Sequence, residues 1–406
     1  MAVKKEPVQP EITIGTAGHI DHGKTALIEV LTGIHTEKHT EEKKRGITIR
    51  LGYADCTVRY CAKCKKYTTS KKCSCGGTTE YILKFSFVDA PGHETLMTTM
   101  LSGAAIMSGA LLVIAANEQC PQPQTKEHLM ALDILGVKNI IIAQNKIDLV
   151  NDAQAEENYN QIKEFVKGTV AENAPIIPVS ANKNVNIDML LKAMAETYTV
   201  PEKPKDEKFI MLVARSFDAN KPGAKIDELN GGILGGIIKQ GKLRKNDEVI
   251  VLPGIKSGED FQKIKTKITS IFTGSKSVDE AGNGGTIAVA TELDPSLAKS
   301  DYLSGTVLVR NEDDIKLYDT MDIELHLIER IVGTENNLEY SPIKINEPLL
   351  INAWTSKTIG TVSSIKGNSI SCRLKIPVAI EKGEKIAVLR RIDNRWRLAG
   401  YGIITN

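Results

Sequence analysis

The sequence predicts an α/β domain followed by two all-β barrel domains, and three observations lead to this prediction. An apolar run at residues 12–14 enters a glycine-containing loop, and a helical pattern leaves that loop at residues 26–31. Buried apolar runs at residues 110–116 and 140–144 are separated by a helical segment, as in a parallel sheet covered by helices. Beyond a proline-containing linker at residues 198–208, short β-rich runs alternate with Gly, Asn and Asp turns, which is typical of β-barrels.

Length and composition limit the number of domains and the classes of function that the chain can have. A chain of 406 residues exceeds one ordinary core, so two or three domains are expected. The net charge of +2 argues neither for nor against nucleic acid, which local basic clusters would have to bind. No stretch reaches about 18 consecutive apolar residues, and residues 1–10 lack the apolar core of a signal peptide, so we expect a cytoplasmic protein without membrane contact. The predicted domains are 1–204 (α/β, with a cysteine-rich insertion at about 56–80), 205–318 (first barrel) and 319–406 (second barrel).

The loop at residues 18–25 reads GHIDHGKT. Gly18 and Gly23 let the backbone bend until successive N–H groups point at phosphate oxygens, and the following helix adds the positive end of its dipole. Lys24 would reach the β- and γ-phosphates, and the Thr25 hydroxyl would bind Mg²⁺. A glycine-rich turn with a chance lysine is the other interpretation, which the flanking strand and helix disfavour. The predicted nucleotide-binding residues of this loop are Asp21, His22, Gly23, Lys24 and Thr25.

The charged segment at residues 33–50 follows the first helix and ends in RGIT at 45–48. By itself it could be a solvated linker. Loops that close on a γ-phosphate through a threonine hydroxyl lie directly after a phosphate loop and helix, so Thr48 is predicted as a second Mg²⁺ ligand.

A predicted strand at residues 81–88 ends in DAPGH at 89–93. Asp89 could hold a Mg²⁺-bound water, Gly92 could offer its N–H to the γ-phosphate, and His93 stands where a group that orients the attacking water is needed. An ordinary turn with a surface histidine is the alternative. The preceding phosphate loop favours the catalytic interpretation.

The strand at 140–144 runs into NKID at residues 145–148. The Asp148 carboxylate can accept two hydrogen bonds from the N1–H and the exocyclic amine of guanine, a pair of donors that adenine lacks. Lys146 would lie along the base, and Asn145 would tie this loop to the phosphate loop. Backbone N–H groups of Ser180, Ala181 and Asn182 would reach the guanine O6. The predicted nucleotide is GTP or GDP.

Four cysteines lie close together in the sequence, as Cys61-x-x-Cys64 and Cys73-x-Cys75. Two close pairs on glycine-bearing turns can place four thiolates around Zn²⁺, and such a closed site would be structural. The single residue between Cys73 and Cys75 is shorter than the usual spacing. A reduced loop without metal is the alternative.

These motifs together resemble the translational GTPases of the elongation factor Tu type. Within that group, the cysteine insertion and the stretches at 115–128 and 215–223 are similar to the gamma subunits of archaeal and eukaryotic translation initiation factor 2. Two departures are the short Cys73-x-Cys75 pair and Ser108, where many relatives carry aspartate. The resemblance covers the whole chain and implies an α/β P-loop GTPase domain followed by two all-β barrels.

The resemblance also implies partners. It implies a carrier that binds initiator methionyl-tRNA with GTP, joins alpha and beta subunits in a heterotrimer, and delivers the tRNA to the small ribosomal subunit. No arginine stands out as a finger, so hydrolysis would await a stimulating factor. Two basic clusters could meet phosphate, although surface lysines and arginines at strand ends explain them equally well. These clusters are Lys239, Lys242, Arg244 and Lys245, and Arg390, Arg391, Arg395 and Arg397.

Three other functions share parts of this pattern. An elongation-type or selenocysteine-specific aminoacyl-tRNA carrier has nearly the same GTP motifs, but the cysteine insertion and the absence of a fourth domain count against it. The GTPase subunit of a sulfate adenylyltransferase shares the three-domain plan. A zinc-dependent RNA-binding module with an inactive nucleotide fold is disfavoured by the intact Lys24, Thr25, Asp89 and Asp148.

Overall fold

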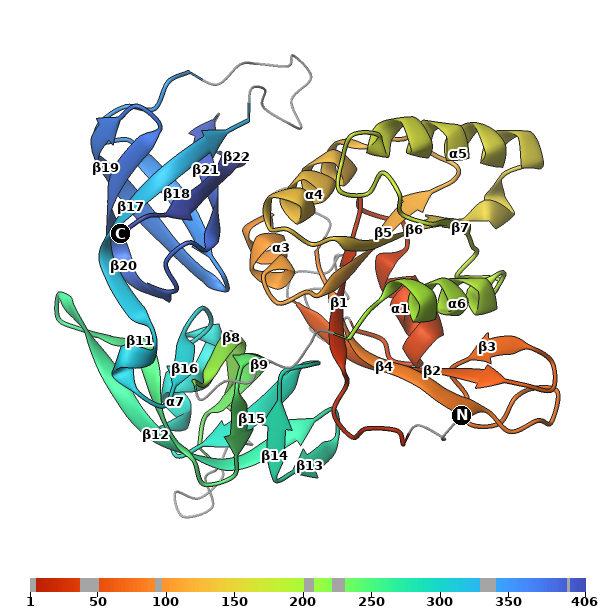
Figure 1. The fold of residues 1–406 in the computed structure, drawn as a ribbon, viewed down its shortest axis with the longest axis horizontal. Helices are drawn as coiled ribbons and strands as arrows, with labels where there is room; N and C mark the ends of the chain where they lie inside the picture. The colour runs from red at the N-terminus through yellow and green to blue at the C-terminus, as the bar shows by residue number, and fades with distance from the viewer. Residues whose placement is uncertain are drawn as a thin grey trace. The chain divides into compact units, whose positions relative to one another are not determined.

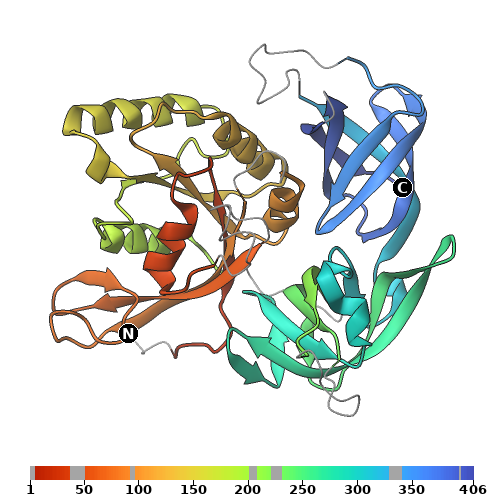
Figure 2. The same ribbon diagram turned by 180° about the vertical axis from the view of Figure 1, so that it is seen from behind.

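The computed structural model describes residues 5–36, 51–91, 97–200, 208–220, 231–328, 341–392 and 395–406. The chain divides into two compact units, the first ending at Pro201 and the second beginning at Glu202. Figure 1 and Figure 2 show an α/β architecture in the first unit and two β-barrels in the second. The predicted fold class is therefore confirmed. No helix in the described ranges is long and apolar enough to cross a membrane.

The first unit is built on a seven-stranded sheet in the order β3-β2-β4-β1-β5-β6-β7. The five strands from β4 to β7 in this order run parallel, whereas β2 and β3 join antiparallel at one edge. The runs predicted at 12–14, 110–116 and 140–144 are strands β1, β5 and β6. The strands are β1 (Ile12–Ala17), β2 (Gly52–Cys61), β3 (Lys66–Thr68), β4 (Glu80–Asp89), β5 (Gly109–Ala115), β6 (Asn139–Asn145) and β7 (Ile176–Pro178).

Helices cover both faces of this sheet (Figure 1). The helices are α1 (Lys24–Thr32), α3 (Met97–Ala104), α4 (Pro123–Ile134), α5 (Asp152–Val166) and α6 (Ile187–Thr197). Leu27 of α1 and Leu190 of α6 pack in one core with Ile14 and Val113 of the sheet, so α1 and α6 share a face. In both views α3, α4 and α5 lie on the other face. Because the carboxyl ends of parallel strands meet at one edge, the loops after β1, β4 and β6 converge there.

The second unit contains two barrels. In the first, β11-β16-β8-β9-β15-β12-β13 follow one another, and pairing of β11 with β12 closes the barrel. In the second, β17-β20-β19-β18-β21-β22 close directly. The first barrel and its appended pieces comprise β8 (Ile210–Phe217), β9 (Ile233–Gln240), β10 (Lys242–Arg244), β11 (Glu248–Ser257), β12 (Asp260–Thr273), β13 (Lys276–Val278), β14 (Glu280–Gly282), β15 (Ile287–Thr291), α7 (Pro295–Ala298) and β16 (Val307–Val309). The second barrel comprises β17 (Lys316–Leu327), β18 (Pro348–Ala353), β19 (Ser356–Lys366), β20 (Ser369–Ile380), β21 (Lys385–Ile392) and β22 (Arg395–Ile404).

Two predicted boundaries fall inside strands. The boundary at 318/319 lies within β17, which pairs with β20 from Lys316 onward, so we propose that the second barrel begins before Lys316. The cysteine-rich insertion predicted at about 56–80 begins within β2, whose pairing with β4 continues to Tyr60. The ends 204 and 205 lie outside the described residues and stay a prediction.

Candidate functional site

The loop that follows β1 depends on glycine at two positions. Gly18 and Gly23 have φ values of 132° and 89°, in the region that favours glycine. A Cβ atom on Gly18 would lie 2.2 Å from the carbonyl oxygen of Val113, and one on Gly23 would lie 2.4 Å from Nδ2 of Asn145. Helix α1 begins directly after Gly23 and has no side-chain N-cap. Its first N–H groups therefore suit an anion from outside the chain.

The Lys24 side chain is folded into this loop. Its Nζ donates to the carbonyl oxygens of Gly18 and His19, at 3.1 and 2.5 Å, and the residue is only 7% exposed. Burial lowers the pKa of Lys24 to about 8, against the opposing attraction of Asp89 and Asp21. Among the described residues, the hydrogen bonds of this buried ammonium go to uncharged carbonyl groups, so a phosphate is a suitable ligand for it.

Asp89 ends β4 and is fully buried. Its Oδ1 accepts from the Thr16 hydroxyl at 2.9 Å, and its Oδ2 accepts from the hydroxyls of Thr25 and Thr36, at 2.9 and 2.6 Å. A carboxylate beside a threonine hydroxyl is a suitable oxygen donor set for Mg²⁺. Thr36 was not predicted as a site residue, because nothing in the local sequence indicates that its hydroxyl reaches a strand end 53 residues later.

Asn145 joins the phosphate loop to the loop after β7. Its Nδ2 donates to the carbonyl oxygen of His22 at 2.9 Å, and its Oδ1 accepts from the backbone N–H of Ala181 at 3.1 Å. The Ser180 hydroxyl donates to Oδ1 of Asp148 at 2.6 Å and so orients that carboxylate. Lys146 has a φ of 63°, which turns the chain from β6 into the short helical turn η2 (Ile147–Leu149) that contains Asp148.

Two of the three backbone N–H groups at residues 180–182 have acceptors within the chain, and their predicted contact with guanine O6 stays a prediction. The Ser180 N–H donates to the carbonyl oxygen of Val185 at 3.2 Å, and the Ala181 N–H is held by Asn145. Within the described ranges, Asn182 supplies the N–H of this triplet that remains for an acceptor from outside. Ser180 also contributes its hydroxyl, which donates to Asp148.

Two buried histidines hold the phosphate loop. His128 of α4 accepts from the Gly18 N–H through Nδ1 at 2.9 Å, and burial lowers its pKa to about 3. His22 lies with its two ring nitrogens 3.2 Å from the carbonyl oxygen of Val113 and 3.3 Å from Oε2 of Glu118, and burial lowers its pKa to about 4. Both imidazoles are therefore neutral near pH 7. His128 was missed in the sequence, where it stands 110 positions from its partner.

Three predicted site residues cannot be placed. Thr48, Gly92 and His93 lie outside the described residues. Their roles stay predictions.

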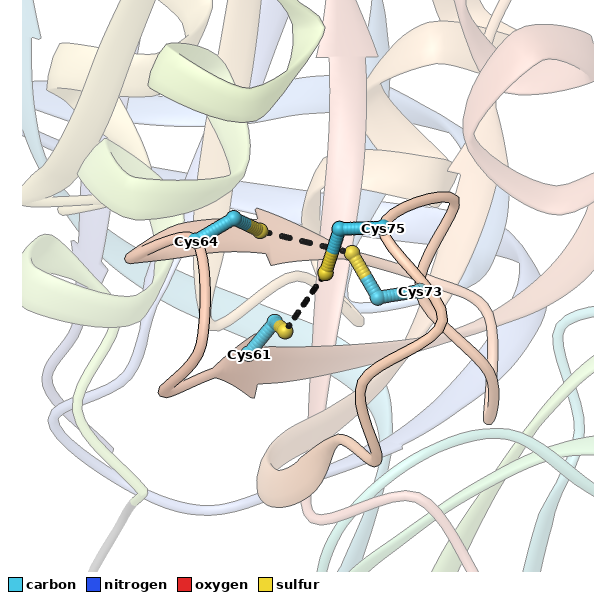
Figure 3. A group of neighbouring side chains, drawn as sticks. All are labelled: Cys61, Cys64, Cys73 and Cys75. Carbon is cyan, nitrogen blue, oxygen red and sulfur yellow. Dashed lines mark hydrogen bonds between the residues drawn. The ribbon is translucent and has the colours of Figure 1, made fainter.

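The four cysteines lie together at the sheet edge (Figure 3). Cys61 and Cys64 belong to the β2–β3 hairpin and face Cys73 and Cys75 on the next loop. The Sγ atoms of Cys61 and Cys75 are 3.5 Å apart, and those of Cys64 and Cys73 are 3.4 Å apart. All four Sγ atoms lie within 4.8 Å of one another. Four Zn–S bonds of about 2.3 Å place tetrahedral sulfurs about 3.8 Å apart, so this arrangement is compatible with zinc.

A tight turn compensates for the short second pair. Gly76 donates its N–H to the carbonyl oxygen of Cys73 at 2.9 Å with a φ of 78°. The backbone N–H of Cys75 and the neighbouring thiols donate to the Cys73 sulfur and lower its pKa to about 6, whereas the hydrogen bond to Cys73 raises the pKa of the Cys64 thiol to about 12.

Four residues of the basic clusters form ion pairs within the chain. Lys239 lies 2.7 Å from Glu384, and Lys242 and Arg244 both bind the Glu280 carboxylate, at 2.7 and 2.8 Å. In the second cluster, Arg390 is buried and binds Glu347 at 2.7 Å. The structural interpretation of these four residues is therefore favoured over phosphate binding.

Comparisons with known proteins cover the whole chain. Family models match for the elongation factor Tu GTP binding domain at 9–200, elongation factor Tu domain 2 at 231–308 and the C-terminal domain of initiation factor eIF2 gamma at 319–404. The translation initiation factor 2 subunit gamma of Methanocaldococcus jannaschii is 52% identical over all of both chains, and that of Pyrococcus horikoshii is 51% identical, again over all of both.

Solved structures show the same fold. A bacterial selenocysteine-specific elongation factor has a TM-score of 0.73 at 24% identity, covering 97% of this chain and 58% of that one. The elongation factor SelB of Methanococcus maripaludis, in complex with a GTP analogue, has a TM-score of 0.73 at 23% identity, covering 99% and 80%.

The buried histidines predict a loss of stability in acid. Unfolding restores the ordinary pKa of about 6.5, so the unfolded chain binds more protons than the folded chain below that pH. Stability should therefore fall as the pH drops below about 6.5, by about 2 kcal/mol for each histidine at pH 5. Urea unfolding of the nucleotide-free protein, followed by the circular dichroism of its helices, measures this slope.

A variant assigns the effect to His128. In His128→Asn, the amide oxygen can still accept from Gly18 but does not titrate, so the slope between pH 6.5 and 5 should fall by about half. A slope as steep in His128→Asn as in the wild type would contradict the assignment.

Proposed function

This chain belongs to the gamma-subunit family of translation initiation factor 2, a family of translational GTPases, and on that premise we propose that it is a GTP-dependent carrier of initiator methionyl-tRNA to the small ribosomal subunit. The observation that carries this proposal is the match at 52% identity along the full chain, including the eIF2 gamma C-terminal domain at 319–404. Likeness to selenocysteine-specific factors extends only to the fold.

The described site residues support the nucleotide part of the proposal. Lys24 and the N-terminus of α1 would bind the β- and γ-phosphates, and Thr25 and Asp89 would hold Mg²⁺ together with Thr48. The bound Mg²⁺ would neutralise charge on the phosphates. Gly92 would donate its N–H to the γ-phosphate, and His93 would orient the attacking water. Loss of the γ-phosphate would release Thr48 and Gly92, and the protein would pass to its tRNA-releasing state.

The partners follow from the same premise. We propose that the chain assembles with alpha and beta subunits into a heterotrimer, that it acts in the cytoplasm, and that a separate factor stimulates hydrolysis. No arginine stands out in the sequence as a finger, so we expect slow intrinsic hydrolysis.

The proposal is tested by filter binding of initiator and elongator aminoacyl-tRNA to the assembled heterotrimer, with GTP or GDP. We expect retention of initiator methionyl-tRNA with GTP, and at least tenfold weaker retention with GDP or with elongator tRNA. Equal retention of both tRNAs would overturn the initiator assignment and favour an elongation-type carrier. Sulfate-dependent GTP turnover would favour the sulfate adenylyltransferase subunit.

Asp148 should select the base. Its Ser180-oriented carboxylate would accept from N1–H and the exocyclic amine of guanine, and an amide at this position cannot accept both bonds. In Asp148→Asn we expect GDP affinity to fall by at least tenfold and affinity for xanthosine diphosphate to rise. Competition binding with both nucleotides measures this change. Asp152→Asn, an exposed acidic residue at the start of α5, is the control, and a retained guanine preference in Asp148→Asn would place the base elsewhere.

We further propose that Cys61, Cys64, Cys73 and Cys75 hold one structural Zn²⁺. Metal analysis of the purified protein should give about one zinc per chain, and Cys73→Ser should lose most of it because a tetrahedral site then lacks one thiolate. Cys372→Ala changes a buried cysteine outside this group and should keep the metal. Full zinc content in Cys73→Ser would contradict the four-cysteine site.

A further inference from the structure

The Thr36 side chain is built into the Asp89 site. Its hydroxyl donates to Oδ2 of Asp89 at 2.6 Å, a shorter bond than those of Thr16 and Thr25, both at 2.9 Å. Thr36 is 7% exposed and Asp89 is fully buried, so this contact is shielded from water.

Gly52 provides the space for Thr36. It begins β2 and lies opposite Asp89 in the β2–β4 register. A Cβ atom on Gly52 would lie 2.8 Å from Cβ of Thr36 and 3.4 Å from Cβ of Asp89. Any larger residue at position 52 would push the threonine away from the carboxylate. The absence of a side chain on one strand thus permits a hydrogen bond to the neighbouring strand.

The hydrogen bond from Thr36 limits how the Asp89 carboxylate can accept further donors. A carboxylate offers about four lone-pair positions on its two oxygens. Thr25 and Thr36 occupy Oδ2, and Thr16 occupies one position on Oδ1. The three hydroxyls come from β1, α1 and the segment after α1, so together they fix the rotation of the carboxylate. One position on Oδ1 remains for an outside donor.

We propose that Thr36 is a positioning residue of the magnesium site, which holds the Asp89 carboxylate so that Oδ1 accepts from a magnesium-bound water. The inference rests on the proposed binding of guanine nucleotide and Mg²⁺. Without the Thr36 hydroxyl, Asp89 keeps its charge but gains rotational freedom and loses a donor. The site should then bind Mg²⁺ less tightly, and the nucleotide should be released at higher Mg²⁺ concentrations than in the wild type.

Two substitutions separate the hydroxyl from the packing. Thr36→Val keeps the shape and removes the hydroxyl, whereas Thr36→Ser keeps the hydroxyl and removes the methyl group. The measurement is the rate of release of a fluorescent GDP from the full-length protein across buffered Mg²⁺ concentrations. Thr36→Val should raise the Mg²⁺ concentration for half-maximal retention about tenfold, and Thr36→Ser should stay within twofold of the wild type.

Gly52→Ala provides an independent route to the same defect. It should shift the Mg²⁺ dependence of GDP release as Thr36→Val does. The double variant should shift it no further, because each change removes the same hydrogen bond between Thr36 and Asp89. A purely structural role would lower the urea midpoint of Thr36→Val but leave the Mg²⁺ dependence of GDP release unmoved.

The outcomes are distinct. An unshifted Mg²⁺ dependence in Thr36→Val, or an equal shift in Thr36→Ser, overturns the positioning role. A wild-type protein that does not retain GDP at any Mg²⁺ concentration overturns instead the proposed function on which the inference rests.

Discussion

A buried carboxylate needs hydrogen-bond donors around it, and the Asp89 carboxylate at the end of β4 has three. This carboxylate lies in the middle of the first sheet and collects hydroxyls from Thr16, Thr25 and Thr36. A strand, a helix and the segment after that helix are thereby brought to two oxygen atoms. The positions of the phosphate loop and of the first residues after α1 both depend on this one group.

The phosphate loop is held from two further sides by uncharged groups. His128 accepts from the Gly18 N–H, and Asn145 donates to the carbonyl oxygen of His22. These bonds fix the backbone without adding charge, so Lys24 remains the single buried cation that we find in the described part of this loop. The loop therefore has its binding conformation before a ligand arrives, and the positive charge of Lys24 attracts an anionic ligand.

Features formed by residues close together in the sequence could be predicted from it. The strands β1, β5 and β6 and the barrel strands follow from apolar runs and turn residues, and the nucleotide motifs follow from their spacing. Contacts between distant positions were not predictable in this way. Thr36 and His128 act on partners far along the chain, and the basic residues Lys239 and Lys242 resembled phosphate ligands because Glu384 and Glu280 are distant in sequence. The short Cys73-x-Cys75 spacing looked unfavourable because the turn at Gly76 is visible only in three dimensions.

The cysteine hairpin has a consequence for solubility. Strand β3 spans only Lys66–Thr68 and forms the outer edge of the first sheet, beside the ten-residue strand β2 (Figure 2). An uncovered strand of that length offers its free N–H and C=O groups to another chain and invites aggregation. Strand β3 pairs with β2 at Arg59–Cys61, so the outermost strand there is only three residues long and carries the exposed Lys66. The hairpin that carries Cys61 and Cys64 thus ends the sheet in a short strand, which offers few unpaired backbone groups to a second chain.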